Sequence, residues 1–228
     1  MSISSSAPWL KYYGDTPQHL KYPQKTIYEM VKAAADKYPK NYAYEFMGKK
    51  TTYAEFMQKI DAAAKAYLAL GIQKGDRVTI CMPNTPQALD CFYALNRIGA
   101  VSNMIHPLSA AQEIAFYLNA SHSKAVLTLD QFYGKVAEIL PQLDDDCKVI
   151  IAKIADELPF PLSVLYPMTK AARQVPKLPK KGYTLWTDLT SSGTDVTLPR
   201  TPARPMIAAQ SFIPAAPPER RRASCSPT

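Results

Sequence analysis

The chain has 228 residues, 47% hydrophobic and 20% charged, so it can bury a sizeable core as one large or two small globular domains. Its formal net charge is +8, but residues 196–228 hold five Arg against one Glu, and the remaining charge does not call for a nucleic-acid partner. The Ser-rich start does not resemble a signal peptide and no stretch reaches the ~20 apolar residues of a membrane helix, so we expect a cytoplasmic protein.

Residues 26–71 predict two helices around a short hairpin. Thr26 and Glu29 have the spacing of a capping box, in which each side chain accepts a hydrogen bond from the other residue's backbone N–H. Thr52 and Glu55 repeat the pattern, and Gly71 ends the second helix. The expected elements are a helix to about Lys37, strands Tyr42–Phe46 and Lys50–Tyr53 around Gly48, and a helix from 52 to 71.

From residue 78 to residue 152 short apolar segments alternate with helical patterns, which predicts an α/β fold with a parallel sheet and helical crossovers. The expected strands are Val78–Met82, Val101–Ile105, Ala125–Leu129 and Val149–Ala152. The helices between them are expected to begin at Thr85 with Pro86, at Ser109 with Gln112 as capping partner, and at Asp130, and Gly99 is expected to end the first.

Proline residues break the pattern after Glu157, and the basic residues that follow have no acidic partner: Lys170, Arg173, Lys177, Lys180 and Lys181. Such a segment can form a basic surface for anionic lipid or nucleotide, and peripheral membrane contact therefore stays open. A solvated connecting loop is the favoured interpretation, because no aromatic residue interleaves the charges before Tyr183.

The four cysteines have no C-x-x-C spacing and are interpreted as structural: Cys81, Cys91, Cys147 and Cys225.

Other residues that could carry chemistry have simpler structural explanations. His106 follows a predicted strand, where open α/β sheets often bind ligands, but no Cys, Asp or Glu stands beside it. Asp144–Asp146 lacks the spaced acceptors and Gly of a calcium loop. Trp186, Tyr183 and Phe132 are interpreted as packing residues. We therefore predict no catalytic, cofactor-binding or metal-binding residue.

Four segments carry a resemblance to a known family. They are T-T-Y-A-E-F (51–56), A-L-G-I-Q-K-G-D-R-V-T-I (69–80), M-P-N-T-P-Q (82–87) and I-G-A-V-S-N-M-I-H-P-L (98–108). In this order they resemble the first two core motifs of the AMP-forming acyl-CoA synthetases, and the opening residues 8–17 are similar to those of fatty-acid-activating members. We interpret the motifs as scaffold, in which Gly71 and Gly75 permit tight backbone and Asp76 can pair with Arg77.

The resemblance implies a partial N-terminal domain of the adenylate-forming fold, over roughly residues 8–190. It also implies the family chemistry, in which a carboxylic acid reacts with ATP and Mg²⁺ to an acyl-adenylate and coenzyme A then displaces AMP. The family's phosphate loop is close to S-G-G-T-T-G-x-P-K-G. Residues 190–194 look like its beginning, but Asp195 and Val196 stand where Thr-Gly is required and no P-K-G follows, so we interpret the likeness as coincidental.

The tail has a different explanation in the genetic code. When codons for residues 215–225 are regrouped by one base, they become compatible with G-T-T-G-T-P-K-G-I-M, and extension in both directions permits A-V-L-Y-S-G-G-T-T-G-T-P-K-G-I-M-L-S-N. We therefore hypothesise a frame change, real or a sequencing error, near residues 197–207. A disordered tail or a basic nucleic-acid arm is the alternative.

The expected organisation is a lead segment (1–25), a partial AMP-binding domain (26–190) and a Pro/Ala/Arg-rich, non-native tail (191–228). We expect a fragment of an acid–thiol ligase that is inactive by itself, binds no cofactor and exposes an apolar sheet face where the rest of its core is missing. A non-catalytic interaction module built on the early sheet and basic loop is the alternative, and it predicts a cooperatively folding, monodisperse chain.

Overall fold

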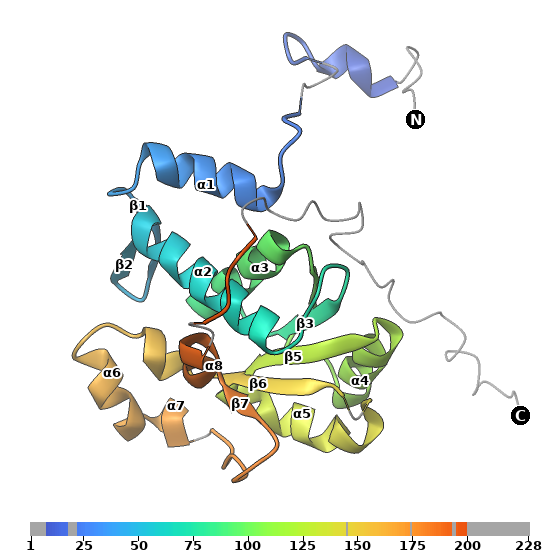
Figure 1. Ribbon diagram of the computed structural model, residues 1–228, viewed down its shortest axis with the longest axis vertical. Coiled ribbons are helices and arrows are strands. Elements are labelled where there is room, and N and C mark those ends of the chain that lie inside the picture. The colour runs from blue at the N-terminus through green and yellow to red at the C-terminus, as the bar shows by residue number, and fades with distance from the viewer. Residues whose placement is uncertain (1–7, 18–21, 145, 174, 193–194, 200–228) are drawn as a thin grey trace, which may run out of the picture.

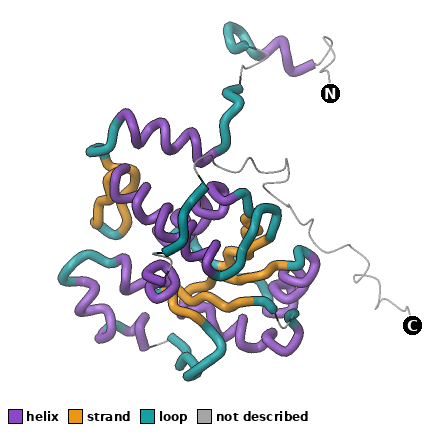
Figure 2. Tube along the Cα trace, viewed as in Figure 1, coloured by secondary structure: helices purple, strands orange, loops and turns teal. Residues whose placement is uncertain are grey.

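A sheet of five parallel strands lies at the centre of the protein, between two layers of helices (Figures 1 and 2). The structure is a computed structural model and describes residues 8–17, 22–144, 146–173, 175–192 and 195–199. The strands are β1 (Tyr42–Phe46), β2 (Lys49–Thr52), β3 (Arg77–Cys81), β4 (Val101–Met104), β5 (Ser123–Leu129), β6 (Lys148–Ala152) and β7 (Thr184–Leu185). The α-helices are α1 (Ile27–Lys37), α2 (Tyr53–Ala69), α3 (Pro86–Ile98), α4 (Ala111–Ala120), α5 (Tyr133–Ile139), α6 (Leu162–Leu165), α7 (Lys170–Arg173) and α8 (Trp186–Ser192). Short 3-10 helices are η1 (Pro8–Tyr12), η2 (Asp130–Phe132), η3 (Leu140–Gln142), η4 (Ile154–Glu157) and η5 (Tyr166–Met168).

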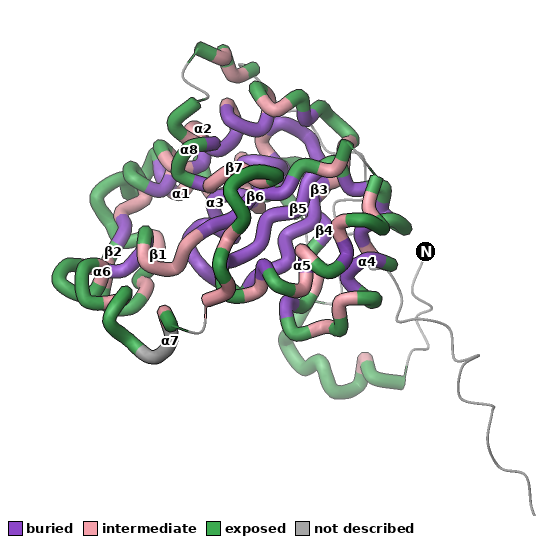
Figure 3. The backbone as a smooth tube through the Cα atoms, turned by 90° about the horizontal axis from the view of Figure 1, so that it is seen from below, coloured by how far each residue is buried: buried purple, intermediate pink, exposed green. Residues whose placement is uncertain are grey.

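The sheet has the order β4-β3-β5-β6-β7, so the predicted α/β fold with a parallel sheet is confirmed. Successive side chains of a strand point to opposite faces, and those of β5 enter two different cores. Leu127 packs with residues of α2, α3 and α8, whereas Val126 packs with residues of α4 and α5. Figure 3 shows the resulting buried centre. Over the described residues both faces of the sheet are therefore covered, contrary to the expected exposed face.

Both predicted capping boxes are present. Thr26 and Glu29 exchange hydrogen bonds at the start of α1, and Thr52 and Glu55 do so at the start of α2. The predicted hairpin is β1 with β2, paired antiparallel. Gly99 ends α3 with φ 79°, a left-handed conformation that costs glycine little.

Four sequence predictions of helix caps and side-chain pairing need correction. Helix α4 begins after Ala110 and has no side-chain cap. Ser109 lies before the helix in a turn in which its N–H donates to His106 O, and its carbonyl accepts a hydrogen bond from Lys135. Asp130 caps no α-helix: it opens η2, and α5 follows only after Phe132.

Asp76 and Arg77 do not pair with each other, because each has other partners. Asp76 forms an ion pair with Lys124 at 3.0 Å and accepts the backbone N–H of Gln73. The Arg77 guanidinium instead donates to backbone carbonyls, including that of Ser121, just before β5, at 2.6 Å. Thr85 holds the predicted N-cap position of α3, but its side chain makes no capping hydrogen bond.

The prolines after Glu157 do not abolish secondary structure, because the chain returns to the sheet. Strand β7 pairs with β6, and α8 then packs against the core, where Trp186 and Leu189 are buried. The sequence pattern predicted neither element. Helix α8 extends to Ser192. The domain limits at residues 25 and 190 stay predictions, and most of the tail lies outside the described residues.

Helix α1 is fastened to α3 by a cap from a distant residue. The Asn96 side chain of α3 accepts the backbone N–H of Tyr28 at 2.9 Å. This N–H lies in the first turn of α1, where it has no partner within the helix. Asn96 is buried, so its amide serves this contact inside the protein rather than at the surface.

We expect Asn96→Ala to lower the free energy of unfolding by about 1–3 kcal/mol, because it leaves a buried N–H without an acceptor. Urea unfolding followed by circular dichroism measures the loss. Asn119→Ala is the matched control, since the Asn119 side chain also makes one hydrogen bond to a backbone group, here as the donor to Gln142 O, but does so at the exposed surface. Equal losses for the two variants would contradict a special role for the buried contact.

Candidate functional site

The carboxyl ends of β3 and β5 meet at the point where the strand order reverses. The chain runs from β3 to β4 on one side and then back past β3 to β5 on the other. Helix α3 therefore covers one face of the sheet and α5 the opposite face. Open α/β sheets bind ligands in the crevice outside the strands at this topological switch point. The residues after β3, β5 and β6 are accordingly the first place to look for chemistry.

Hydrogen bonds join the strand ends at this edge. Thr128 at the end of β5 donates its hydroxyl to Cys81 O at the end of β3, at 3.0 Å. Asp130 follows β5 and accepts the N–H of Gln131 at 2.9 Å. Burial raises the pKa of the Asp130 carboxyl above its ordinary value. The edge therefore has fixed geometry and carries a partly desolvated acid next to the carboxyl end of β5.

Three buried polar side chains gather at the start of α3. Gln87 donates its amide to Lys153 O at 3.0 Å, which ties α3 to the end of β6. The Thr85 hydroxyl, the amide oxygen of Gln87 and one carboxyl oxygen of Asp90 have no hydrogen-bond partner among the described residues. Burial raises the pKa of Asp90 to about 7. This carboxyl can therefore change its charge near neutral pH, inside the protein.

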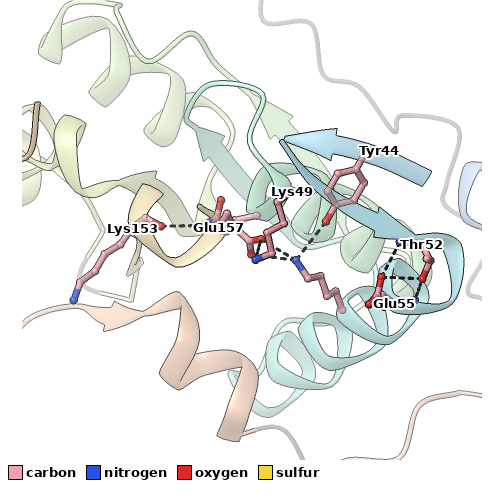
Figure 4. Close-up of polar contacts among 8 residues, drawn as sticks. Tyr44, Lys49, Thr52, Glu55, Lys153 and Glu157 are labelled. Atoms are coloured by element: carbon pink, nitrogen blue, oxygen red, sulfur yellow. Dashed lines mark hydrogen bonds and ion pairs between the residues drawn. The ribbon is translucent and has the colours of Figure 1, made fainter. Parts of the chain in front are cut away.

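Glu157 of η4 is the centre of an ion-pair cluster beside these residues (Figure 4). It accepts hydrogen bonds from Lys59 of α2 at 2.9 Å and from Lys49 of β2 at 3.3 Å. Lys59 also reaches the Tyr44 hydroxyl at 3.4 Å. Burial alone disfavours the Lys59 ammonium, but the hydrogen bond to Glu157 and the charge of Asp90 leave its pKa raised.

The cluster is suited to holding parts together rather than to binding phosphate. Its lysines face the charges of Glu157 and Asp90, and the next carboxyl in the chain, Asp156, has a pKa that burial raises. A triphosphate would need cations and backbone N–H groups that are not already matched by carboxylates. What the contacts do is join α2 and the β1–β2 hairpin to the segment that follows β6.

The stretch that looks like a phosphate loop does not fit that role where it is described. Thr190, Ser191 and Ser192 are the last turn of α8, and their hydroxyls donate to carbonyls of the same helix. A phosphate would require these donors to be free and the backbone to be looped. Residues 193 and 194 lie outside the described residues.

The sequence candidates lie apart from one another. His106 is exposed at the end of β4, and its Nδ1 accepts the Leu108 N–H at 3.2 Å. Asp144 and Asp146 are exposed, and Asp145 lies outside the described residues. Within the described part of the chain no three His, Cys, Asp or Glu side chains gather in a way that could hold a metal ion.

The cysteines that the structure describes are free thiols. Cys81 and Cys91 are buried in the two cores, and burial raises the pKa of each thiol to about 12. Cys147 is half-buried and its pKa rises to about 11 for the same reason. Such thiols stay protonated and unreactive at neutral pH, which is the structural role predicted for them. Cys225 lies outside the described residues.

The aromatic candidates pack as predicted. Trp186 is buried with its ring 6.3 Å from that of Tyr67, and Tyr183 lies 6.2 Å from Tyr133. Phe132 is partly buried against the core that α2 and α3 form.

Sequence reasoning missed the polar cluster, although part of it has a sequence signal. Gln87 and Asp90 occupy positions on the inward-facing stripe of α3, together with Cys91 and Ala94. Polar residues in such a stripe are a sign of a buried polar contact. Glu157 and Lys59 are 98 residues apart, so no local pattern connects them.

Comparison with known proteins agrees with this architecture. The fold is of the doubly wound α/β class, with a parallel sheet that helices cover on both faces. The sequence pattern of the family described as AMP-binding enzyme matches residues 31–201. The chain belongs to the AMP-binding enzyme family.

Three relatives give the scale of the similarity. A long-chain-fatty-acid–CoA ligase of Bacillus subtilis strain 168 is 31% identical over 169 residues, which are 74% of this chain and 30% of the ligase. The N-terminal domain of FACL13 from Mycobacterium tuberculosis is 28% identical with a TM-score of 0.53, covering 69% of this chain and 39% of that domain. A benzoate CoA ligase of Burkholderia xenovorans LB400 shares the fold at 16% identity and a TM-score of 0.59, covering 78% of this chain and 30% of the ligase.

The chain thus spans about 30% of the length of the Bacillus subtilis relative. Among the described residues no helix is both long and apolar enough to cross a membrane.

We expect Glu157→Gln to lower the free energy of unfolding by about 1–3 kcal/mol, below the cost of breaking a fully buried pair because Lys59 keeps 31% of its side chain exposed. A double-mutant cycle with Lys59→Met, measured by urea unfolding, isolates the pair. Glu113→Gln on the exposed face of α4 is the control. A coupling energy of zero between positions 59 and 157 would contradict the fastening role.

Asp90→Asn tests the buried acid. A carboxyl whose pKa is raised on folding binds its proton more tightly in the folded state, so its ionisation costs stability as pH rises from about 4 to about 7. The cost is absent below this window and constant above it. The variant lacks this cost, so its stability relative to wild type should grow by about 2–3 kcal/mol between pH 5 and pH 8.

The charges facing Asp90 are Lys59 from α2, Glu157 from η4 and Lys49 from β2, and they stay in place in the variant. Asp36→Asn is the control, because Asp36 is exposed in an i,i+4 pair with Lys32. A stability difference for Asp90→Asn that does not change with pH would show that the carboxyl does not titrate in this range.

Proposed function

We propose that this chain is the N-terminal part of an ATP-dependent acid–thiol ligase that activates a fatty or related carboxylic acid through an acyl-adenylate. The observation that carries the proposal is the family match over residues 31–201, together with similarity to the Bacillus subtilis long-chain-fatty-acid–CoA ligase over 74% of the chain. Relatives named for acetate and benzoate share parts of the sequence or the fold, so the acid depends on residues beyond the scaffold.

The frame-change hypothesis agrees with the extent of this match. The family pattern ends at residue 201, inside the interval 197–207 where the phase of the codons is expected to change. A longer protein in the restored phase would supply the phosphate loop, and it would use ATP, Mg²⁺ and coenzyme A. The role of the present chain is the scaffold: a sheet with covered faces and a fastened edge against which the remaining parts can assemble.

By itself the chain is proposed to be inactive as a ligase. The described hydroxyls of residues 190–192 are taken up within α8, and the lysines at the sheet edge already face carboxylates. Electrostatic stabilisation of the reacting phosphate is usually the largest catalytic contribution, so its loss would remove measurable turnover.

A cytoplasmic location is part of the proposal. The three cysteines described are free thiols, which is the state that cytosolic proteins keep.

The interaction module remains a second candidate, and one observation favours it. Both faces of the sheet are covered within this chain, so it does not need further segments to bury its strands. Cooperative unfolding and a monodisperse monomer in sedimentation velocity would be expected of such a module. A nucleic-acid arm formed by the Arg-rich tail involves residues outside those described.

Acid-dependent ATP–pyrophosphate exchange tests the proposal. We expect the chain to give no exchange above a no-protein control. The source gene should be sequenced from codon 190 to well past the stop, and the protein encoded in the shifted phase expressed. That protein should exchange pyrophosphate with long-chain acids in preference to acetate or benzoate.

Two results would contradict the proposal. Exchange by the present chain would show that the chemistry does not need the missing loop. A shifted phase that closes at once would remove the ligase and leave the interaction module as the function to pursue.

A further inference from the structure

The segment between β6 and β7 forms a surface that the ligase proposal does not use. It contains η4, α6, η5 and α7, and Figures 1 and 3 show α6 and α7 at the periphery of the molecule. We call it the apolar–basic surface. Its apolar part is Phe160, Leu162, Val164, Leu165 and Met168, and its basic part is Arg173, Lys177, Lys180 and Lys181.

The apolar side chains are turned to solvent. Phe160 is 84% exposed and Met168 is 74% exposed. Leu162, Val164 and Leu165 are 45%, 65% and 49% exposed. Val164 and Leu165 are the last residues of α6, and Met168 is the last residue of η5, which follows directly. Exposed apolar residues are normal when scattered, but five within nine residues form a patch.

Local hydrogen bonds hold this patch in shape. The N–H groups of Ser163, Val164 and Leu165 donate to the carbonyls of Pro159 and Pro161, which closes the turn that presents the side chains. Gln131, next to the carboxyl end of β5, donates its amide to the Tyr166 hydroxyl at 2.9 Å. The surface is therefore attached to the sheet edge and is not a loose loop.

The segment that carries the patch is basic after η4, whose Asp156 and Glu157 lie at its amino-terminal end and whose Glu157 is buried in ion pairs with Lys49 and Lys59. Residues 158–187 include five basic residues and no Asp or Glu. Arg173, Lys177, Lys180 and Lys181 are exposed. A solvated loop, or a surface that packs against the rest of a protein, normally carries both acidic and basic side chains. A segment that combines basic residues with an apolar patch and has no acidic residue has the composition of a membrane-surface contact.

We propose that the apolar–basic surface binds the surface of an anionic lipid bilayer. Phe160 and Met168 enter the boundary between headgroups and acyl chains, and the basic residues contact the lipid phosphates. Bases of a nucleic acid would need aromatic platforms between the charges, and in this segment the first aromatic residue after the charges, Tyr183, packs beside Tyr133. The contact would be peripheral and reversible, and it does not depend on the ligase activity.

Co-sedimentation of the full chain with vesicles tests the proposal. We expect binding to vesicles of phosphatidylcholine mixed with phosphatidylglycerol, and weaker binding to phosphatidylcholine alone or at high salt. Phe160→Ser combined with Met168→Ser should lower the partition coefficient roughly tenfold or more, and Lys177→Gln, Lys180→Gln and Lys181→Gln together should do the same at low salt.

Matched variants elsewhere on the surface serve as controls. Met47→Ser with Leu108→Ser removes two other well-exposed apolar side chains, 63% and 67% exposed. Lys37→Gln, Lys40→Gln and Lys74→Gln together remove the same charge as the test variant. These controls should change binding less than about twofold. All the altered side chains are exposed, and cooperative urea unfolding checks that every variant is folded. Charge in residues 200–228 is common to all variants and cancels in the comparison.

Four outcomes would overturn the proposal. The first is an absence of binding to anionic vesicles, and the second is equal losses in the test and control variants. The third is a concentration-dependent dimer that Phe160→Ser with Met168→Ser abolishes, because the occupant is then a second copy of the chain. The fourth is a longer, restored-phase protein that fails to bind while the present chain binds, because the rest of the enzyme then covers the surface.

Discussion

The fold depends on the burial of both faces of a parallel sheet. Parallel strands cannot be joined by tight hairpins, so each needs a crossover, and the crossovers become the layers that cover the sheet. Strand β5 shows the constraint most directly, because Leu127 and Val126 are neighbours in sequence but belong to two cores on opposite faces. Strand β5 pairs with β3 on one side and with β6 on the other. Because crossovers between parallel strands are right-handed, this strand order determines which face of the sheet each of α3, α4 and α5 covers.

The same constraint explains the polar cluster at the sheet edge. Helix α3 must pack closely on the sheet, and this brings Gln87 and Asp90 out of water at the carboxyl ends of the strands. A buried acid is costly when ionised, and neighbouring ammonium groups reduce that cost only in part, which is why the pKa of Asp90 rises to about 7 even with Lys59 near it. Glu157 instead meets two lysines directly, and its side chain is only 11% exposed. One edge thus holds an acid that titrates and an ion-pair cluster that joins distant segments.

Sequence alone predicted the parts of the fold that are determined locally. The capping boxes at Thr26 and Thr52, the stop at Gly99 and the core strands are encoded within a few residues, and the structure contains them. What failed depended on contacts between distant residues. Helix α4 begins after Ala110 rather than at Ser109, whose carbonyl accepts a hydrogen bond from the distant Lys135, and β7 is only two residues long and is paired with β6. The cluster of Lys59 with Glu157 joins residues 98 apart, which no local pattern can reveal.

The edges of the sheet bear on whether the described part of the chain can fold without further strands. Within the described residues the five strands of the sheet all lie between residues 77 and 185. Each inner strand is therefore paired on both sides by strands from the same stretch of the chain. An open edge invites aggregation when it is long, flat and apolar. Strand β7 is very short, and β4 carries Ser102 and Asn103 among its four residues, with Asn103 held by hydrogen bonds to Thr79 and Ser121. These edges are poor templates for uncontrolled strand addition, so a chain that spans about 30% of the length of its Bacillus subtilis relative can still be a folding unit.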